Sequence, residues 1–507
     1  LMKKRRNNIN VIMLLAALVI GLISCEKDTP QYLPYEGYAY SELTINGGNW
    51  TPVLQSAGDA IAIDTPSSSD SQEYINELEE VKEAMANMNS NQKKAIKYWT
   101  NNPAVRWNEI ALELIAKYNL IPGPNDDGTY TLPNPSNPDG PPAFPFAHPP
   151  YASRALAYMS VAQFDGLISA WHYKYEYNRA APFQQDETIE FAYEENDIPS
   201  FPSDGAVVAR ASKNILSAMF PLEVEYLKQM EEEHLESLML SGGNVMSDIT
   251  AGLEIGDAVS ETALIRAAGD GMRNAQAAYD RFGWAWDNLE IPERPVGLTP
   301  LFSQVTMWSI DDVESVRPIP PPQLDSQEFL DDVEVLKDYA KNMTDEKRRI
   351  ANFWQDGLGT YTPPGHWNRI ANEMIVEYKL NPLQTTRTLA YMNMAIMDSG
   401  ISCWDAKYYY HYPRPIQMID GFETIAGTPN FPSYTSGHSV FSAAASEVLA
   451  YIFPEEASTV RAWAEEAAIS RVYGGIHWSF DATVGTDQGR EVAQYTIDRA
   501  KADGADN

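Results

Sequence analysis

The sequence predicts an all-α protein built from two tandem helical bundles that pack against each other, the first of them a degenerate copy of the second. Three observations lead to this prediction. Segments containing Trp, Gly and Pro recur at long, regular offsets, apolar residues follow helical spacing in both copies, and strand-like alternation is rare. At 507 residues, of which 44% are hydrophobic and 11% aromatic, the chain is long enough for a large double core.

Residues 1–24 have the pattern of a bacterial lipoprotein signal peptide. A basic run at 3–6 precedes an apolar stretch at 11–23, which is short for a membrane-spanning helix of about 20 residues. A lipobox ends at Cys25, the expected lipidation site, and residues 25–69 are the expected tether and linker. An ordinary signal peptide with an incidental cysteine is the alternative. We expect a cell-envelope lipoprotein of the outer membrane, on its periplasmic face or the cell surface.

The charge and cysteine content exclude several classes of function. The formal net charge is −33 and the acidic residues are spread along the chain, so nucleic acid is not expected as a partner. Membrane contact is expected only through the N-terminal lipid. The one other cysteine, Cys403, leaves no intramolecular disulfide or thiolate metal site in the processed chain, and we expect it to be a buried small hydrophobe.

The internal repeat divides the rest of the chain into copies at residues 70–290 and 325–507. Three blocks of matching sequence define it: Asp70 to Glu73 with Asp325 to Glu328, Trp107 to Pro122 with Trp367 to Pro382, and Leu156 to Lys174 with Leu389 to Lys407. The offset falls from 260 to 233 between the last two blocks because the first copy carries an insert at 123–150, which is predicted to be a long loop. The connector 291–324 contains a stiff proline run.

The repeat also indicates which copy carries the chemistry. Positions that correspond to charged or imidazole residues of the second copy have lost them: Ala181 for Arg414, Leu238 for Arg471 and Asn244 for His477. A local slip of three residues aligns Phe201-Pro202-Ser203 with Phe431-Pro432-Ser433, and no histidine follows in the first copy. Only Lys174 is retained, and we expect it to be exposed or in a salt bridge. The first copy is therefore predicted to be scaffold.

Three blocks of the second copy carry the residue types that bind a tetrahedral oxyanion. They are Lys407 with Arg414-Pro415, the run from Pro432 to His438, and Ser470-Arg471 with His477 and Asp481. Two guanidinium groups can each bind two oxygens with permanent charge, and the lysine adds a third cation. A helix that opens at Ser436-Gly437-His438 would offer its backbone amides to the anion.

Two spacings in these blocks predict local geometry. Lys407 and Arg414 are two helical turns apart and would share one face of a helix, which the prolines beside Arg414 are predicted to end. His477 and Asp481 are four residues apart, so the carboxylate can orient the imidazole if this segment is helical.

The order and spacing of these blocks resemble the superfamily that joins vanadium-dependent haloperoxidases with type 2 phosphatidic acid phosphatases and bacterial acid phosphatases. Segments 398–407 and 470–481 are most similar to the vanadium chloroperoxidase branch. The resemblance implies a paired helical-bundle fold that holds vanadate, in a site that phosphate can also occupy, without haem or nucleotide. It implies His477 as the metal ligand, and hydrogen bonds to vanadate oxygens from Lys407, Arg414, Ser436, Gly437 and Arg471.

The same resemblance assigns further roles. His438 would be the acid–base residue, Lys407 would polarise bound peroxide, and Asp481 would support His477. Trp404 and Phe431 would line a dry halide pocket, although both are also the kind of aromatic residue that fills a helical core.

Two enzymatic functions remain open, with a third, non-enzymatic alternative. A haloperoxidase would use hydrogen peroxide, a halide and a small organic acceptor. An acid phosphatase would cleave a phosphate ester through a phosphohistidine at His477. Vanadate mimics the transition state of phosphoryl transfer, so the three blocks fit both, and the aromatic pair favours the haloperoxidase. The third alternative is a surface lipoprotein that binds phosphate or a partner through the first copy. The short stretch from His438 to Arg471 leaves the halide preference open.

Overall fold

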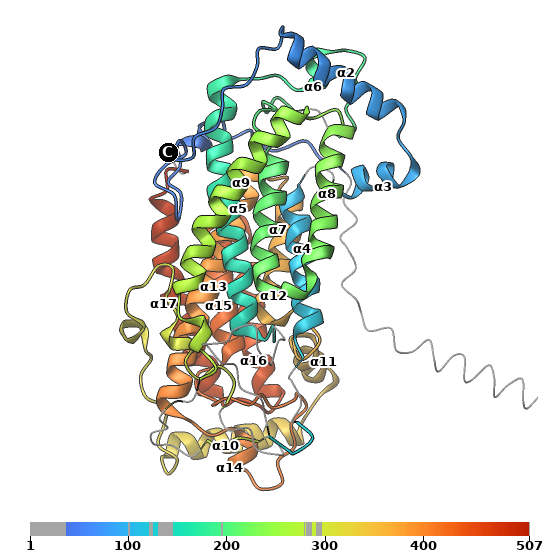
Figure 1. The fold of residues 1–507 in the computed structure, drawn as a ribbon. Coiled ribbons are helices and arrows are strands. Elements are labelled where there is room, and N and C mark those ends of the chain that lie inside the picture. Colours follow the sequence, from blue (N-terminus) through green and yellow to red (C-terminus); the bar gives the residue numbers. More distant parts are fainter. Residues whose placement is uncertain are drawn as a thin grey trace, which may run out of the picture. The chain divides into compact units, whose positions relative to one another are not determined.

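The computed structural model describes residues 37–99, 102–120, 125–129, 146–193, 196–277, 279, 286–289 and 297–505. The expected signal peptide, Cys25 and most of the insert at 123–150 lie outside the described residues. One compact unit spans Glu36–Asn507. The described residues form helices and no strand, which confirms the all-α prediction (Figure 1). Among them, no helix has both the length and the apolar character needed to cross a bilayer.

The helices of the two halves repeat in order and in length. The first half contains α2 (Gln72–Ala86), α3 (Ser90–Tyr98), α4 (Pro103–Tyr118), α5 (Pro149–Tyr177), α6 (Pro182–Gln185), α7 (Asp204–Met219), α8 (Val224–Leu240) and α9 (Met246–Gly269). The second contains α10 (Gln327–Lys341), α11 (Asp345–Phe353), α12 (Thr362–Glu377), α13 (Pro382–Tyr410), α14 (Pro415–Met418), α15 (Gly437–Ile452), α16 (Ala457–Tyr473) and α17 (Ser479–Lys501). This repetition supports the predicted duplication.

Short 3₁₀ helices complete the described elements. They are η1 (Ile45–Asn49), η2 (Pro221–Glu223), η3 (Met272–Asn274), η4 (Phe302–Gln304), η5 (Val313–Val316) and η6 (Pro454–Glu456). The first long helix of each copy begins in the same way, because Ser71 accepts a hydrogen bond from the amide of Tyr74 and Ser326 accepts one from that of Phe329. The predicted starts of the copies at residues 70 and 325 therefore lie just before equivalent helix caps.

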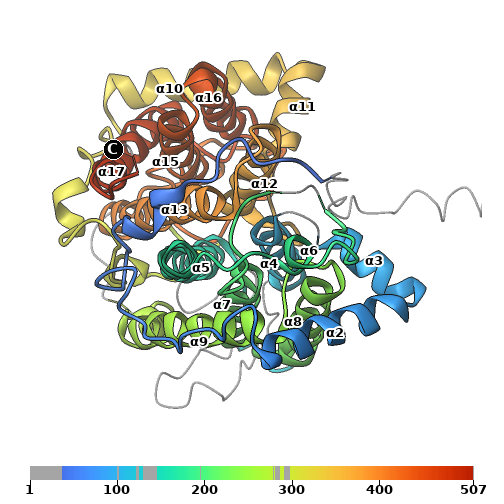
Figure 2. The same ribbon diagram turned by 90° about the horizontal axis from the view of Figure 1, so that it is seen from above.

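The two 29-residue helices α5 and α13 pack against each other at the centre and are almost wholly buried. Figure 2 shows α7, α8 and α9 on one side of this pair and α15, α16 and α17 on the other. Equivalent residues meet where the copies touch: Asn108 donates to Asn368 at 2.9 Å, and Asn393 donates to Ser160 at 3.0 Å. Such contacts are expected of an approximate two-fold axis. Accordingly, α6 and α14, which follow the two central helices, lie at opposite ends of them (Figure 1).

The proline-rich part of the connector lies along the second copy. Tyr410, Tyr434 and Tyr412 donate hydrogen bonds from their hydroxyl groups to the carbonyl oxygens of residues 318, 319 and 322, respectively. The segment has no repeating backbone hydrogen bonds of its own, as expected for a proline run. It is therefore fixed to the copy that carries the predicted chemistry. Cys403 is buried within α13, as predicted.

Candidate active site

His477 and Asp481 form the innermost pair of the candidate site. Nδ1 of His477 lies 2.8 Å from Oδ2 of Asp481, and both side chains are buried. The expected contact between carboxylate and imidazole is therefore present, although the segment is not helical at His477 because α17 begins only at Ser479. Asp481 instead folds back over the helix N-terminus, where its Oδ2 also accepts a hydrogen bond from the amide of Trp478 at 3.2 Å. A proton on Nδ1 therefore leaves a lone pair on Nε2 of His477.

Arg414 faces that lone pair. Its Nη1 lies 3.0 Å from Nε2 of His477, and Nε and Nη2 donate to the carbonyl oxygen of Phe431 at 3.1 and 3.0 Å. The prediction that Arg414 shares a helix face with Lys407 is wrong. Helix α13 ends at Tyr410, and the next residue, His411, has a left-handed φ of 47°. Arg414 reaches the site from the loop that follows, between the two prolines.

Lys407 is the second buried cation. Its Nζ donates to the carbonyl oxygens of Pro432 and Ser433 at 3.0 and 2.8 Å, and also to that of Thr435. Burial lowers the pKa of Lys407 to about 7. The lysine is therefore held beside the loop that leads into α15 and loses its proton more readily than an exposed lysine.

The N-terminus of helix α15 lies beside the same group of residues, Lys407, Arg414 and His477. Ser436 caps the helix, and its Oγ accepts a hydrogen bond from the amide of Ser439 at 3.4 Å. Gly437 is buried, yet a Cβ built on it would meet nothing closer than 3.8 Å from Phe441 and 4.0 Å from Trp404. These are ordinary van der Waals distances, and the lack of a side chain at Gly437 leaves its backbone amide open to the close approach of a ligand.

His438 and Arg471 lie on the other side of the candidate site. Nε2 of His438 is enclosed and has no hydrogen-bond partner among the described residues. Burial, and then the charge of Arg471, lower the pKa of His438 well below its usual value. The guanidinium group of Arg471 donates to the Ser470 hydroxyl at 2.9 Å and to the carbonyl of Ala351. Arg471 lies in the last turn of α16, which Gly474 caps.

The two aromatic residues predicted for a halide pocket also lie here. The rings of Trp404 and Phe431 are 4.9 Å apart, and Nζ of Lys407 and Cζ of Arg414 lie 5.1 and 5.2 Å from the centre of the Phe431 ring. Nε1 of Trp404 donates to the carbonyl oxygen of Leu298 at 3.1 Å. Both rings therefore form an apolar wall directly against two of the site's cations.

The charge balance of the site favours a bound anion. Among the described residues, three buried cations, Lys407, Arg414 and Arg471, are accompanied by two carboxylates, Asp481 and Asp356, and burial raises the pKa of Asp481 to about 7. Burial, Arg414 and Lys407 together lower the pKa of His477 well below its usual value, so its imidazole is neutral. Uncompensated buried positive charge is costly, and a multiply charged oxyanion would relieve it.

The sequence did not point to three other polar residues near the site. Ser433 donates a hydrogen bond to Oδ2 of Asp481. Nδ1 of His366 lies 3.1 Å from both carboxylate oxygens of Asp356, and its ring stacks on Trp354 at 4.5 Å. The charge of His366 lowers the pKa of His438. The position of His366 carries an arginine in the first copy, Arg106, and this difference between the copies is the signal that could have revealed it.

The first copy has a counterpart to each part of this site. Ser203 caps α7 as Ser436 caps α15, and the amides of Ser203 and Ser436 donate to the carbonyl oxygens of Asp248 and Asp481 at 2.9 and 3.0 Å. These pairs are 233 residues apart, so the predicted slip of three residues is wrong. Asp204 therefore replaces Gly437, and Gly205 replaces His438.

Comparisons with known proteins agree with this description. Residues 387–499 match the family model of the PAP2 superfamily. The vanadium chloroperoxidase of Curvularia inaequalis is 23% identical in an alignment 226 residues long, which covers 26% of this chain and 37% of that protein. The matched region is thus little more than a third of that relative's length.

Two solved structures share the fold. A bacterial vanadium-dependent iodoperoxidase has a TM-score of 0.58 and 21% identity, covering 78% of this chain and 95% of that one. A holo-type bacterial vanadium-dependent chloroperoxidase has a TM-score of 0.51 and 15% identity, covering 76% and 99%. The resemblance stated from the sequence is confirmed: the chain has the all-α vanadium haloperoxidase fold, and its C-terminal part matches the PAP2 superfamily.

Proposed function

We propose that this chain is a vanadium-dependent haloperoxidase-like enzyme that uses hydrogen peroxide to oxidise a halide to a hypohalous species. One observation carries the proposal: the neutral His477 presents Nε2 beside Arg414, within a group of three buried cations that also includes Lys407 and Arg471. Trp404 and Phe431 supply an apolar wall against two of these cations, which suits a halide stripped of water.

The residues present fit vanadate. His477 would coordinate the metal through Nε2, while hydrogen bonds to its oxygens would come from the side chains of Lys407, Arg414, Ser436 and Arg471 and the amide of Gly437. When bound, vanadate supplies a Lewis-acid centre that activates hydrogen peroxide. The excess of buried positive charge described above is the feature that selects a multiply charged oxyanion for this position.

The chain's own residues would control protons and water. Asp481 holds the Nδ1 proton of His477, so the lone pair stays on Nε2. His438 is neutral near pH 7 because burial and Arg471 lower its pKa, so its enclosed Nε2 can accept a proton from peroxide and return it to a product. Lys407 would donate a hydrogen bond to the bound oxidant, and the Trp404–Phe431 wall would exclude water.

The test is halogenation of monochlorodimedone by the purified protein after incubation with orthovanadate, with hydrogen peroxide and iodide, bromide or chloride in turn. We expect turnover with at least one halide, none without vanadate, and none with peroxide omitted. The absence of turnover with all three halides, in protein shown to bind vanadate, would contradict the proposal.

The second candidate is an acid phosphatase, which the PAP2 superfamily match favours. Nε2 of His477 would attack phosphorus, and His438 would protonate the leaving oxygen. Steady hydrolysis of p-nitrophenyl phosphate in vanadate-free buffer, inhibited by vanadate and without halide oxidation, would favour this function.

We also propose that Cys25 carries a lipid that holds the protein at the outer membrane. The lipobox before it supports this proposal. Full-length protein should fractionate with membranes and a Cys25→Ser variant should not. Equal membrane association of both would contradict it.

A further inference from the structure

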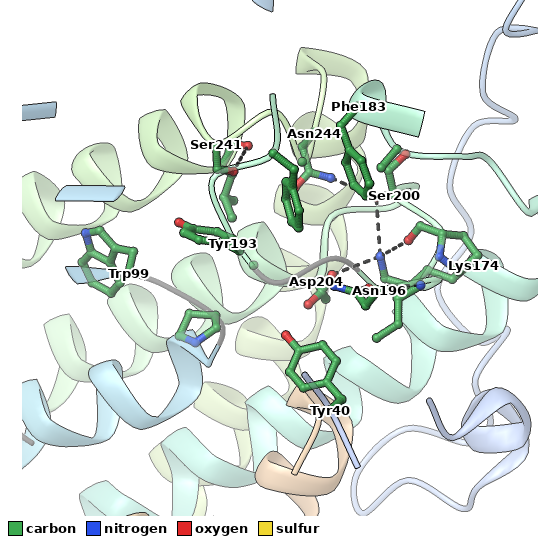
Figure 3. Close-up of a pocket in the computed structure, with 18 residues that line it drawn as sticks. Tyr40, Trp99, Lys174, Phe183, Tyr193, Asn196, Ser200, Asp204, Ser241 and Asn244 are labelled. Atoms are coloured by element: carbon green, nitrogen blue, oxygen red, sulfur yellow. Dashed lines mark hydrogen bonds and ion pairs between the residues drawn. The ribbon is translucent and has the colours of Figure 1, made fainter. Parts of the chain in front are cut away.

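A cavity of about 100 Å³ lies in the first copy, at the position that corresponds to the candidate active site (Figure 3). Lys174, Asp204 and Asn244 line it, and they occupy the positions of Lys407, Gly437 and His477. Lys174 is buried and its Nζ lies 3.0 Å from Oδ1 of Asp204, so of the two predicted alternatives the salt bridge is correct.

Deletion of large side chains explains why there is space here. Ala181, Gly205 and Leu238 line the cavity where the second copy has an arginine, a histidine and another arginine. The backbone around these positions is retained, as the matching caps of α7 and α15 show. When side chains are truncated and the backbone is retained, a void remains because the surrounding structure relaxes only partially.

The same replacements reverse the electrostatic preference of the site. The second copy has three buried cations near Asp481 and Asp356. Here Lys174 faces Asp204, a carboxylate at the position of a glycine, and the buried Arg179 faces Asp248, the equivalent of Asp481. Asp197 adds a second acid at the adjoining opening, beside Phe183 and Asn196. The carboxylate of Asp204 occupies the place of the oxyanion and already neutralises Lys174. A phosphate or vanadate would meet like charge and is excluded.

Aromatic rings form much of the remaining wall. Phe183 and Phe191 stack at 4.3 Å, the Phe191 and Tyr193 rings meet edge to face at 5.5 Å, and Tyr40 lines the cavity from another direction (Figure 3). The hydroxyl of Tyr193 is enclosed, and its partners within the protein are the hydroxyl groups of Ser237 and Ser241. Asp204 is half-buried, and only one of its oxygens has an ion-pair partner among the described residues.

We propose that this cavity binds a small organic cation, an ammonium group carried on a single ring or a short alkyl chain. The ammonium would bind the second oxygen of Asp204 and the faces of the aromatic wall, since cations bind to aromatic rings and carboxylates together. A purely apolar ligand would leave the second oxygen of Asp204 without a partner. The site would thus be a remodelled oxyanion pocket of inverted charge, and it does not rest on the function proposed for the second copy.

The test is a series of three ligands that share one ring and differ in charge: benzylammonium, benzyl alcohol and benzoate. Each is titrated calorimetrically into the full chain with the second copy saturated with orthovanadate, so that an anion cannot bind there. We expect benzylammonium to bind at least about tenfold more tightly than benzyl alcohol, and benzoate not to bind. Equal affinity for the alcohol and the ammonium, or preference for benzoate, would overturn the proposal.

Two variants locate the binding. Asp204→Asn should weaken benzylammonium binding at least about tenfold, while Asp487→Asn, the same change on the exposed face of α17, should leave it unchanged. Ala181→Leu should block binding by filling the cavity without changing its charge. Unchanged binding in a folded Asp204→Asn or Ala181→Leu protein would overturn the proposal. If neither variant folds, the ligand series on the unmodified chain still decides the ligand class.

Discussion

The two copies of the bundle use the same helices for different purposes. Corresponding helices differ in length by at most one residue, and the long central pair, α5 and α13, has 29 residues in each copy. The buried lysines at their C-terminal ends nevertheless differ in their partners. Both lysines donate to backbone carbonyl oxygens. Lys174 is also neutralised by Asp204, whereas Lys407 has no carboxylate partner among the described residues and has a lowered pKa. The two copies therefore share a backbone arrangement but differ in the charges it carries. Only the second copy retains the excess of positive charge that suits an oxyanion.

A second comparison concerns equivalent tryptophans. Trp99 stacks on His234 at 4.3 Å, and Trp354 stacks on His366 at 4.5 Å. His234 comes from α8, is fully buried and accepts a hydrogen bond from Nε1 of Trp107 at 3.2 Å. His366 comes from α12 and is held by Asp356. The same stacking thus serves packing in one copy and lies beside the candidate catalytic residues in the other.

The largest expected effect is that of His477→Ala. Loss of the imidazole that would bind the metal should lower halide oxidation, or phosphate ester hydrolysis, by roughly a thousandfold or more. His172→Ala, the same change in the first copy at a half-exposed position, should leave the rate within about twofold. Steady-state rates on folded protein are the measurement. Comparable losses in both variants would contradict the assignment of chemistry to the second copy alone.

Asp481→Asn should have the next largest effect. An amide can no longer fix the Nδ1 proton of His477, and we expect a loss of about 10- to 100-fold in vanadate affinity or activity. Titration with vanadate, followed by measurement of halide oxidation, separates a loss of vanadate affinity from a loss of activity. Asp487→Asn on the same helix is the control, and a wild-type vanadate affinity and rate in Asp481→Asn would show that the pair has no functional role.

Substitutions of the histidines that stack on Trp99 and Trp354 should affect stability and activity differently. His234→Ala removes a buried ring, so urea denaturation should show a loss of about 2–4 kcal/mol in the free energy of unfolding, with normal activity per folded molecule. His366→Phe keeps a ring on Trp354 but removes the partner of Asp356, so activity should fall more than stability. A loss of activity in His234→Ala together with a loss mainly of stability in His366→Phe would refute this distinction between the two histidines.

The smallest expected effect concerns the pH dependence of the free energy of unfolding, to which two equivalent buried carboxylates should contribute differently. Asp165 accepts three backbone amides and Asp398 two, and burial raises their pKa values to about 6 and about 7. A raised pKa means that the folded state binds the proton more readily than the unfolded state. The resulting stability is present below about pH 4 and is lost as pH rises toward 7.

Urea unfolding measured from pH 4.5 to 7.5 should therefore show a falling free energy of unfolding, on the order of 1 kcal/mol or more per group. Asp398→Asn should flatten this dependence more than Asp165→Asn. A free energy of unfolding that rises over this range in both variants and the parent would contradict the account.

The sequence predicted those parts of the molecule that depend on local pattern. The order of helices and the start of α15 after Ser436 follow from spacing and from residue preferences at helix ends. The set of cations and imidazoles was also readable, because the repeat contrasts it with a copy that lacks it.

The remaining features depend on how loops bring distant residues together. Asp356 has a left-handed φ of 42° in the loop before α12, and only that turn directs its carboxylate to His366. The start of α17 at Ser479 changed the geometry of the His477–Asp481 pair without changing their contact. The cavity of the first copy arises from side chains that are missing, which a pattern search for functional residues does not register.

The number of vanadium atoms bound per chain tests the central claim most directly. Protein equilibrated with orthovanadate, freed of excess and analysed for metal should hold one vanadium per chain, and halide oxidation should rise in proportion to that occupancy. His477→Ala should hold none. Two atoms per chain would mean that the first copy still binds the oxyanion, and none in the parent protein would mean that the buried cations of the second copy serve another purpose.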